Sequence, residues 1–337
     1  MLRVPFDQLH AALLRAMHQL GLTEARATLC ARLFAETTRD GIYTHGLNRF
    51  PRFVETIRNG SIDVYAEPTK SAGIGAIERW DGHSGIGNLN AHASMQRAIT
   101  LAQQHGTGAV ALANTNHWMR GGTYGWQAAE QGLFALCWTN TLANLPPWGA
   151  TTPALGNNPL VIAVPHPGGH VVLDMAMSQF SYGTLAAYSK RGEPLPVEGG
   201  FDTAGNLTRD PAAIESSQRA LPVGYWKGSG LSLVLDMLAA MLSGGLATHQ
   251  IPSDPLRESG LSQVFLAISP TAIADPDELT RIAEGILDSL HQATPADPSN
   301  PIRYPGEQTL QLREENMRLG VPVDPEIWQQ LTLSTTQ

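Results

Sequence analysis

The sequence carries little charge, and what charge it has is mostly acidic. Only 15% of its 337 residues are Asp, Glu, Lys or Arg, against roughly 25% in a typical soluble domain. The 22 basic and 30 acidic side chains give a formal net charge of −8. Nucleic-acid-binding proteins need a basic surface, which such a chain lacks. We therefore expect no nucleic-acid partner. The low charge also suggests that a second subunit covers part of the surface.

Cysteines and long apolar runs are scarce as well. Cys30 and Cys137 are the only cysteines, and no CxxC pair exists, so a zinc ribbon or a thioredoxin-type motif is excluded. The richest apolar run, residues 231–242, is interrupted by Asp236 and is too short to cross a bilayer. The first residues show no pattern of a secretory signal. These features predict a cytoplasmic protein without a membrane partner.

Several common catalytic signatures are missing. No GxxxxGK[ST], GxSxG or HExxH pattern occurs, which removes P-loop ATPases, the commonest serine hydrolases and zincins. The glycine-rich run at 84–90 has Asn90 where a dinucleotide fingerprint needs its third glycine. His166 and His170 are separated by Pro-Gly-Gly, which predicts a turn rather than a metal site. We expect neither a Rossmann phosphate loop nor a metal.

The spacing of apolar residues predicts a helical N-terminal part followed by an α/β body with several hairpin-like connections. The chain accordingly divides into three expected parts, residues 1–65, 66–295 and 296–337. Helices are expected near 6–17, 23–41, 47–57, 88–104, 124–130, 231–242, 276–292 and 308–318. Strand-like runs are expected at 71–80, 108–112, 133–138, 160–164 and 171–175, with a hairpin turn at 166–169.

A histidine and an arginine lie together in a loop between two expected helices. His45 stands where one helix has ended and the next has not begun, and Arg49 follows four residues later. An imidazole titrates near neutral pH and can donate a proton, and a guanidinium fork suits a carboxylate. A capping or surface role for His45 remains open at this stage.

Three further places combine polar chemistry with a probable ligand-binding position. Asn116, His117 and Arg120 follow a buried strand, where α/β proteins place ligands, although a polar loop over buried aromatics is the alternative. Lys227 precedes an expected helix and could help to hold an anion at its N-terminus. Asp174 ends an apolar strand and needs a partner if it is buried.

Six motifs follow one another in an order that resembles a known family. They are Tyr43-Thr44-His45-Gly46, Asn116-His117-Trp118-Met119-Arg120-Gly121-Gly122, Pro146-Pro147-Trp148-Gly149, Gly156-Asn157-Asn158-Pro159-Leu160, Leu173-Asp174-Met175-Ala176 and Gly224-Tyr225-Trp226-Lys227-Gly228. Together they resemble the malate/L-lactate dehydrogenase family that lacks a Rossmann fold. The resemblance extends from Phe6 to Trp328. It implies an α/β fold of the α+β type, with a mostly antiparallel nucleotide-binding sheet, flanking helices and a helical N-terminal subdomain. It also implies a homodimer.

The resemblance further implies NADH-dependent reduction of a 2-keto acid, with NADPH as the alternative cofactor. His45 falls on the proton donor, and Thr44 replaces the usual serine before it. The implied cofactor contacts are His170, Val171, Val172, Leu173, Asp174, Met175, Ala176, Trp226, Lys227, Gly306, Glu307 and Gln308. Relatives carry Gly-His-Glu at the last three of these positions.

Roles for the remaining candidates are hypotheses. Asp174 would stabilise the imidazolium of His45, directly or through water, and Arg49 would hold the substrate carboxylate. Thr44, Asn116, His117 and Arg120 would complete the substrate site, and their polarity favours a sugar-derived, polyhydroxylated 2-keto acid. The alternatives are malate, lactate, sulfolactate, ureidoglycolate or a cyclic imino acid as substrate, or a ligand-binding relative without catalysis.

Overall fold

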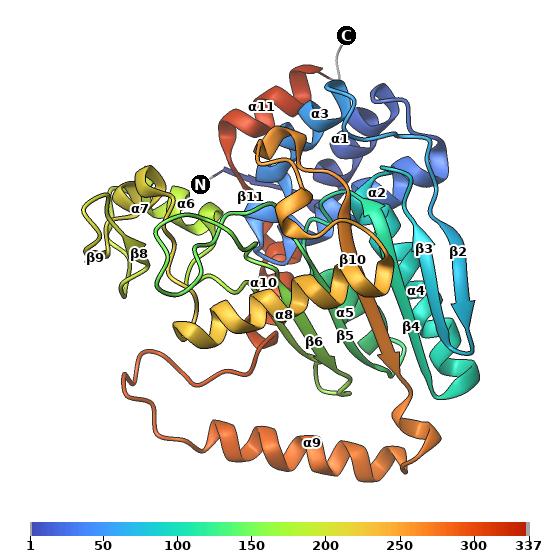
Figure 1. Cartoon of the computed structure of the whole chain (residues 1–337). Coiled ribbons are helices and arrows are strands. Elements are labelled where there is room, and N and C mark those ends of the chain that lie inside the picture. The colour runs from blue at the N-terminus through green and yellow to red at the C-terminus, as the bar shows by residue number, and fades with distance from the viewer. Residues whose placement is uncertain (1, 335–337) are drawn as a thin grey trace.

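A seven-stranded sheet forms the centre of the computed structural model, which describes residues 2–334 (Figure 1). Every neighbouring pair in it is antiparallel except β3 and β4. The predicted mostly antiparallel, non-Rossmann sheet is therefore confirmed. In spatial order the strands are β2 (Thr69–Ile74), β3 (Ile77–Asp81), β4 (Thr107–Thr115), β10 (Leu261–Ile268), β5 (Phe134–Thr139), β6 (Leu160–Val164) and β7 (Val171–Met175).

Helices cover both faces of this sheet. On one face, α4 (Gly87–His105) and α5 (Gly122–Ala129) share a core with Val110 and Phe265. On the other face, α8 (Trp226–Ser243) packs against Ala111 and Val264. These two residues are the neighbours of Val110 and Phe265 in β4 and β10. Because side chains alternate across a strand, the two cores lie on opposite faces, as Figure 1 shows for α8 and α5.

The two ends of the chain pack together in a third core. The N-terminal helices are α1 (Phe6–Gln19), α2 (Glu24–Arg39) and α3 (Phe50–Arg58), and the C-terminal elements are α10 (Glu307–Leu319), β11 (Val321–Val323) and α11 (Pro325–Ser334). The strand β11 pairs with β1 (Leu2–Val4), and its Val321 is buried with Leu13 and Phe34. The expected division into three parts remains a prediction, but the last segment clearly contributes to the core of the first.

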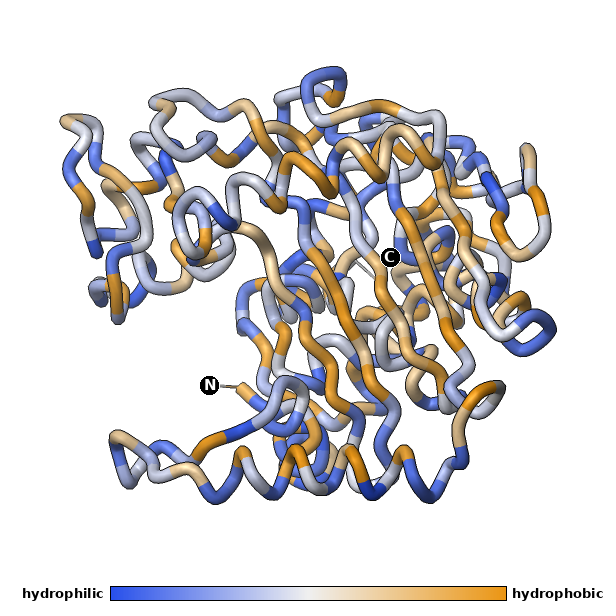
Figure 2. The backbone as a smooth tube through the Cα atoms, turned by 60° about the horizontal axis from the view of Figure 1, so that its bottom comes forward, coloured by the Kyte–Doolittle hydropathy of each residue, from blue (hydrophilic) through white to orange (hydrophobic). Residues whose placement is uncertain are grey.

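Two peripheral parts complete the fold. A small lobe contains α6 (Tyr182–Arg191), α7 (Pro211–Ser217), β8 (Gly200–Phe201) and β9 (Leu207–Thr208). The helix α9 (Pro276–His291) stands off from the sheet (Figures 1 and 2) and has no buried residue. Three short turns, η3 (Thr248–Gln250), η4 (Pro255–Arg257) and η5 (Pro270–Ala272), lie between α8 and α9. Within residues 2–334, no helix is both long and apolar enough to span a membrane.

The structure confirms the expected helices to within a few residues, and it confirms the β6–β7 hairpin across residues 166–169. The glycine-interrupted stretch at 71–80 is a hairpin, with Gly75 at φ +55° in its turn. Four longer elements had not been predicted, namely β10, α6, α7 and α11.

Candidate active site

His45 sits in a short helical turn, η1 (Tyr43–His45), between α2 and α3. The turn is fixed to α2 because the backbone N–H of Leu47 donates to Thr38 Oγ1 at 2.9 Å. A Cβ at residue 46 would collide with both the side chain and the backbone of Thr38, so only glycine allows this approach. The neighbouring Thr44 Oγ1 lies 3.1 Å from His45 Nδ1. The local sequence thus holds the imidazole in one place.

His45 borders a cavity of about 370 Å³. Thr44, Arg49 and His117, three of the residues predicted for the substrate site, also line it. Several other lining residues had not been predicted for the site: Arg52, Thr141, Asn144, Asn157, Ser181, Tyr182, Gln218 and Glu258. The cavity is therefore a chamber with many polar side chains. It brings the predicted proton donor, His45, together with Arg49, the residue predicted to bind the substrate carboxylate.

The two histidines of this cavity stack on each other, with ring centroids 5.9 Å apart and planes 15° apart. The backbone N–H of Met119, which has φ +64°, donates to His117 Nδ1 at 3.1 Å. A nitrogen that accepts a hydrogen bond carries no proton, so the proton of neutral His117 is on Nε2. Burial, with the positive charge of Arg49 nearby, holds the pKa of His117 well below its usual value. His117 is thus a fixed, uncharged donor.

The pKa of His45 is also low. Burial, followed by the positive charges of Arg49 and Arg120, lowers it to about 4. Neither histidine is charged at neutral pH in the ligand-free protein, and the permanent positive charge of the cavity comes from its arginines.

Arg49 and Arg52 both approach the buried carboxylate of Glu258. The Nη2 atoms of Arg49 and Arg52 lie 3.9 and 3.6 Å from Glu258 Oε2. Burial and the neighbouring Arg52 lower the pKa of Arg49 to about 10, so its guanidinium stays charged at neutral pH. Arg52 follows Arg49 by one helical turn, a spacing that could have suggested it. Glu258 arrives from a distant part of the chain and left no signal in the sequence.

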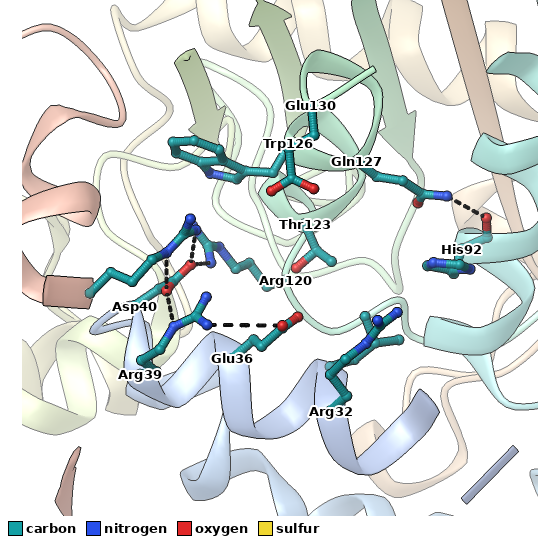
Figure 3. A pocket seen from close by; sticks show the side chains of 12 residues that line it. Arg32, Glu36, Arg39, Asp40, His92, Arg120, Thr123, Trp126, Gln127 and Glu130 are labelled. Atoms are coloured by element: carbon teal, nitrogen blue, oxygen red, sulfur yellow. Dashed lines mark hydrogen bonds and ion pairs between the residues drawn. The ribbon is translucent and has the colours of Figure 1, made fainter. Parts of the chain in front are cut away.

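Arg120 and Asn116 lie outside this cavity. The Nη1 of Arg120 donates to Asp40 Oδ2 at 2.7 Å, and Asp40 also binds Arg39 and, through two hydrogen bonds, Arg313. Although burial opposes ionisation, these arginines lower the pKa of Asp40 to about 2. Figure 3 shows Asp40 between Arg39 and Arg120 in a separate cavity of about 150 Å³.

Asn116 uses its amide group to hold the backbone. Its Nδ2 donates to the carbonyl oxygens of Ser84 and Gly85 at 2.8 and 2.9 Å. Neither Asn116 nor Arg120 lines the cavity of His45, although Asn116 borders a small pocket with Arg49, His117 and Glu258. Their substrate contacts remain a prediction.

Asp174 lies on β7 and does not touch His45. Its Oδ2 accepts a hydrogen bond of 2.7 Å from the backbone N–H of Gly122. Burial of the carboxyl group raises its pKa, although the residue as a whole is exposed. No hydrogen bond or ion pair between Asp174 and His45 occurs in the part of the chain that the structure describes. Of the two routes expected, a direct contact is not seen, and stabilisation of the imidazolium through water remains a prediction.

The structure brings together two of the three expected cofactor stretches. The backbone N–H of Val172 donates to the carbonyl oxygen of Pro305 at 2.8 Å. Gly306, at φ +101°, packs so closely that a Cβ there would lie 3.0 Å from the carbonyl oxygen of His170. The strand β7 lies at the edge of the sheet. The backbone N–H and C=O groups of every second residue in it therefore point away from β6, as those of Val172 do. Asp174 thus presents open backbone groups in the same region.

This edge fits a dinucleotide. Gly306 caps the N-terminus of α10, and the free N–H groups of a helix N-terminus attract anions such as a pyrophosphate. Glu307 is occupied, since its Oε2 accepts from the backbone N–H of Tyr304 at 3.0 Å and lies 3.1 Å from His291 Nε2. Gln308 is exposed.

The third expected cofactor stretch lies at the start of α8, where Trp226 and Lys227 are both exposed. The backbone N–H of Val223 donates to the carbonyl oxygen of Met177 at 2.8 Å. The loop before α8 therefore runs beside the chain just after β7. Within residues 2–334, no group of three His, Cys, Asp or Glu side chains is placed to hold a metal ion.

Comparison with known proteins yields matches over nearly the whole chain. The pattern of the malate/L-lactate dehydrogenase family matches residues 4–332. A 2,3-diketo-L-gulonate reductase of Shigella boydii serotype 4 is 48% identical over 327 residues, which are 97% of this chain and 98% of that protein. The sulfolactate dehydrogenase of Methanocaldococcus jannaschii superposes with a TM-score of 0.90 at 26% identity, covering 98% of this chain and 95% of that one. A delta1-piperideine-2-carboxylate reductase of Pseudomonas syringae pv. tomato gives 0.88 at 28% identity, covering 98% and 99%.

Proposed function

The chain belongs to the malate/L-lactate dehydrogenase family, and on that premise we propose that it reduces the C2 ketone of a sugar-derived 2-keto acid with NADH. The proposed reaction converts 2,3-diketo-L-gulonate to 3-keto-L-gulonate. The observation that carries the proposal is the cavity in which His45, Arg49 and His117 meet, together with full-length similarity to a reductase of that name.

In the proposed reaction, His45 donates a proton to the oxygen of the C2 ketone. Arg49 binds the substrate carboxylate, and the Nε2–H of His117 donates a hydrogen bond to the same substrate. A carboxylate beside Arg49 offsets the positive charge that lowers the pKa of His45. Substrate binding therefore favours the protonated imidazole that the reaction needs. A positioned general acid of this kind contributes about 10² to 10⁴-fold to the rate.

NADH, when bound, supplies the hydride that adds to C2. The residues proposed to hold it are 170–176, which include β7, together with Gly306 at the start of α10 and Trp226 with Lys227 at the start of α8. The open edge of β7 and the helix N-terminus beside it support this assignment. NADPH remains the alternative cofactor, because no residue of the cleft yet distinguishes the two.

We further propose that the enzyme is a homodimer of the cytoplasm. Two apolar surfaces of the chain support a second subunit. The helix α9 exposes Ile282, Ile286 and Leu290, and α8 exposes Leu231, Val234, Met237, Leu238 and Met241. Contiguous apolar surfaces of this kind usually mark an interface. The two cysteines are buried and unpaired, which suits a reducing compartment.

Oxidation of NADH, followed at 340 nm with a panel of 2-keto acids, tests the proposed function. The panel includes 2,3-diketo-L-gulonate, pyruvate, oxaloacetate, sulfopyruvate and a cyclic imino acid. We expect the highest kcat/KM with the sugar acid. A higher kcat/KM with any other member would replace the proposed substrate, and no turnover with any of them would overturn the reductase assignment.

A further inference from the structure

Glu258 is the one carboxylate that lines the cavity of His45. The residue is 8% exposed and follows η4, and its Oε1 accepts from the backbone N–H of Leu142 at 3.2 Å. Its other oxygen, Oε2, faces Arg49 and Arg52. An acidic side chain fixed inside the chamber that receives an anionic substrate needs an explanation.

The two arginines are paired with Glu258 only loosely. Their Nη2 atoms lie 3.9 and 3.6 Å from its Oε2, which is longer than a hydrogen bond. Arg120 and Arg313, in contrast, bind Asp40 at 2.7 to 3.0 Å. Arg52 Nη2 also donates a hydrogen bond to the carbonyl oxygen of Pro255, so Arg49 is the arginine of the pair whose guanidinium is better placed to bind a ligand carboxylate.

The charges around the cavity leave room for one carboxylate. Arg49, Arg52 and Glu258 are the only Arg, Lys, Asp or Glu side chains lining it, which gives a sum of +1. One substrate carboxylate balances that charge. A second anionic group would find no further permanently charged side chain, since the proton that His45 gains serves the ketone oxygen, and it would lie in the same chamber as Glu258. Like charges brought together in this way oppose binding strongly.

The rest of the lining is neutral and mixes polar side chains with apolar ones such as Leu142, Ala143 and Pro153. Thr141, Asn144, Asn157, Ser181, Tyr182 and Gln218 contribute hydroxyl and amide groups. Asn144 Oδ1 is buried without a hydrogen-bond partner in the part of the chain that the structure describes. A buried acceptor without a donor is costly, and a substrate hydroxyl would supply one. The wall suits an uncharged, hydroxylated tail.

We propose that Glu258 selects the substrate by charge. It admits 2-keto acids that carry one carboxylate and a neutral polar tail, and it disfavours those with a second anionic group. This inference rests on the proposed function and deepens it, because it explains how the same scaffold can separate sugar acids from dicarboxylates.

Calorimetry on the NAD⁺-saturated enzyme tests this inference, because NAD⁺ cannot reduce a keto acid. The probes are 2-oxoglutarate and its 5-methyl ester, which have similar length but two charges and one charge. We expect wild type to bind the ester at least about tenfold more tightly than the diacid. In Glu258→Gln this preference should fall at least about tenfold. Glu258→Asp, which keeps the charge, should retain it.

Glu193→Gln is the matched control, since it removes one negative charge from an exposed residue paired with Arg191 outside the cavity. It should leave the preference unchanged. The proposal is overturned if wild type binds the diacid as tightly as the ester, or if Glu258→Gln keeps the wild-type preference. If Glu258→Gln does not fold, the wild-type and Glu258→Asp comparisons still decide the matter. Failure of the proposed function would show separately, as absence of NADH oxidation with an intact charge preference.

Discussion

At the scale of single residues, the environment of His45 explains how the proposed proton donor can be buried in the free protein and still gain a proton for the reaction. Burial and two cations disfavour its charged form in the free protein. In the proposed reaction, a substrate anion at Arg49 removes part of that cost. The imidazole would then hold its proton mainly when the substrate is present, which would restrict proton delivery to the loaded site.

This coupling predicts opposite pH profiles for the two directions of the reaction. Reduction needs protonated His45, and the pKa of about 4 in the free protein lies below the neutral range. The kcat/KM for reduction should therefore fall as pH rises from 5 to 8, whereas the kcat/KM for oxidation of the hydroxy acid should not. Because kcat reports the substrate complex, kcat for reduction should persist to higher pH than kcat/KM. Steady-state profiles in both directions provide the check, and a kcat/KM for reduction that increases with pH would contradict the role of His45.

Residues near one another in the sequence were the ones whose placement could be predicted. Thr44, His45 and Arg49 share one loop, and the structure places all three on one cavity. Asp40 and Glu258 were missed because their partners lie far away along the chain and only folding brings them together. The same limitation applies to Arg120, whose substrate contact remains a prediction. Its position after a buried strand suggested a ligand contact, while the fold gives it the buried carboxylate of Asp40.

At the scale of elements, the central strand β10 was not predicted although its neighbours were. Residues 261–268 read Leu-Ser-Gln-Val-Phe-Leu-Ala-Ile, and six of the eight are buried. A strand covered on both faces shows no alternation of apolar and polar residues. The polar Ser262 and Gln263 also hid the strand from a search for apolar runs. Both can be buried because their side chains donate hydrogen bonds to backbone carbonyls inside the fold.

The N-terminus of α8 carries the prediction that tests the cofactor cleft. Lys227→Ala removes a cation from the first turn of the helix, where charge and helix dipole both favour the anionic part of NADH. A charge-assisted contact contributes about 1.5–3 kcal/mol, so the Kd for NADH should rise roughly ten- to a hundredfold. Fluorescence titration of NADH measures it.

For comparison, Lys190→Ala removes an exposed lysine of α6, which forms an ion pair with Asp324. NADH affinity in that control should match wild type. An unchanged Kd in Lys227→Ala would place Lys227, and with it Trp226, outside the cofactor site.

At the scale of the whole molecule, the low charge content and the isolated α9 have one explanation. No residue of α9 is buried within the described chain, so its apolar side chains need a surface from elsewhere. The second subunit of the proposed dimer would provide one, and it would cover the apolar side of α8 in the same way. Most of the stability of a helix in a protein comes from the packing of its apolar face, so docking of α9 would contribute to the stability of the proposed assembly.

Ile286→Glu on α9 tests this assembly. The isoleucine is 64% exposed in the single chain, so a monomer would tolerate the change, whereas an apolar interface would not tolerate a buried unpaired carboxylate. Sedimentation velocity should show a dimer for wild type and a shift towards monomer for the variant. Ile74→Glu, at an 82% exposed position of the β2–β3 hairpin, is the control. A wild-type protein that sediments as a monomer at micromolar concentration would contradict the account.

The central claim is that this chain reduces a 2-keto acid with His45 as proton donor. The most direct test compares the turnover of wild type and His45→Ala with 2,3-diketo-L-gulonate and NADH at neutral pH, alongside the Kd of each for NADH. We predict that kcat falls at least about 10²-fold while the Kd for NADH stays within twofold. Turnover by His45→Ala at the wild-type rate, with the same product, would show that the proton comes from elsewhere.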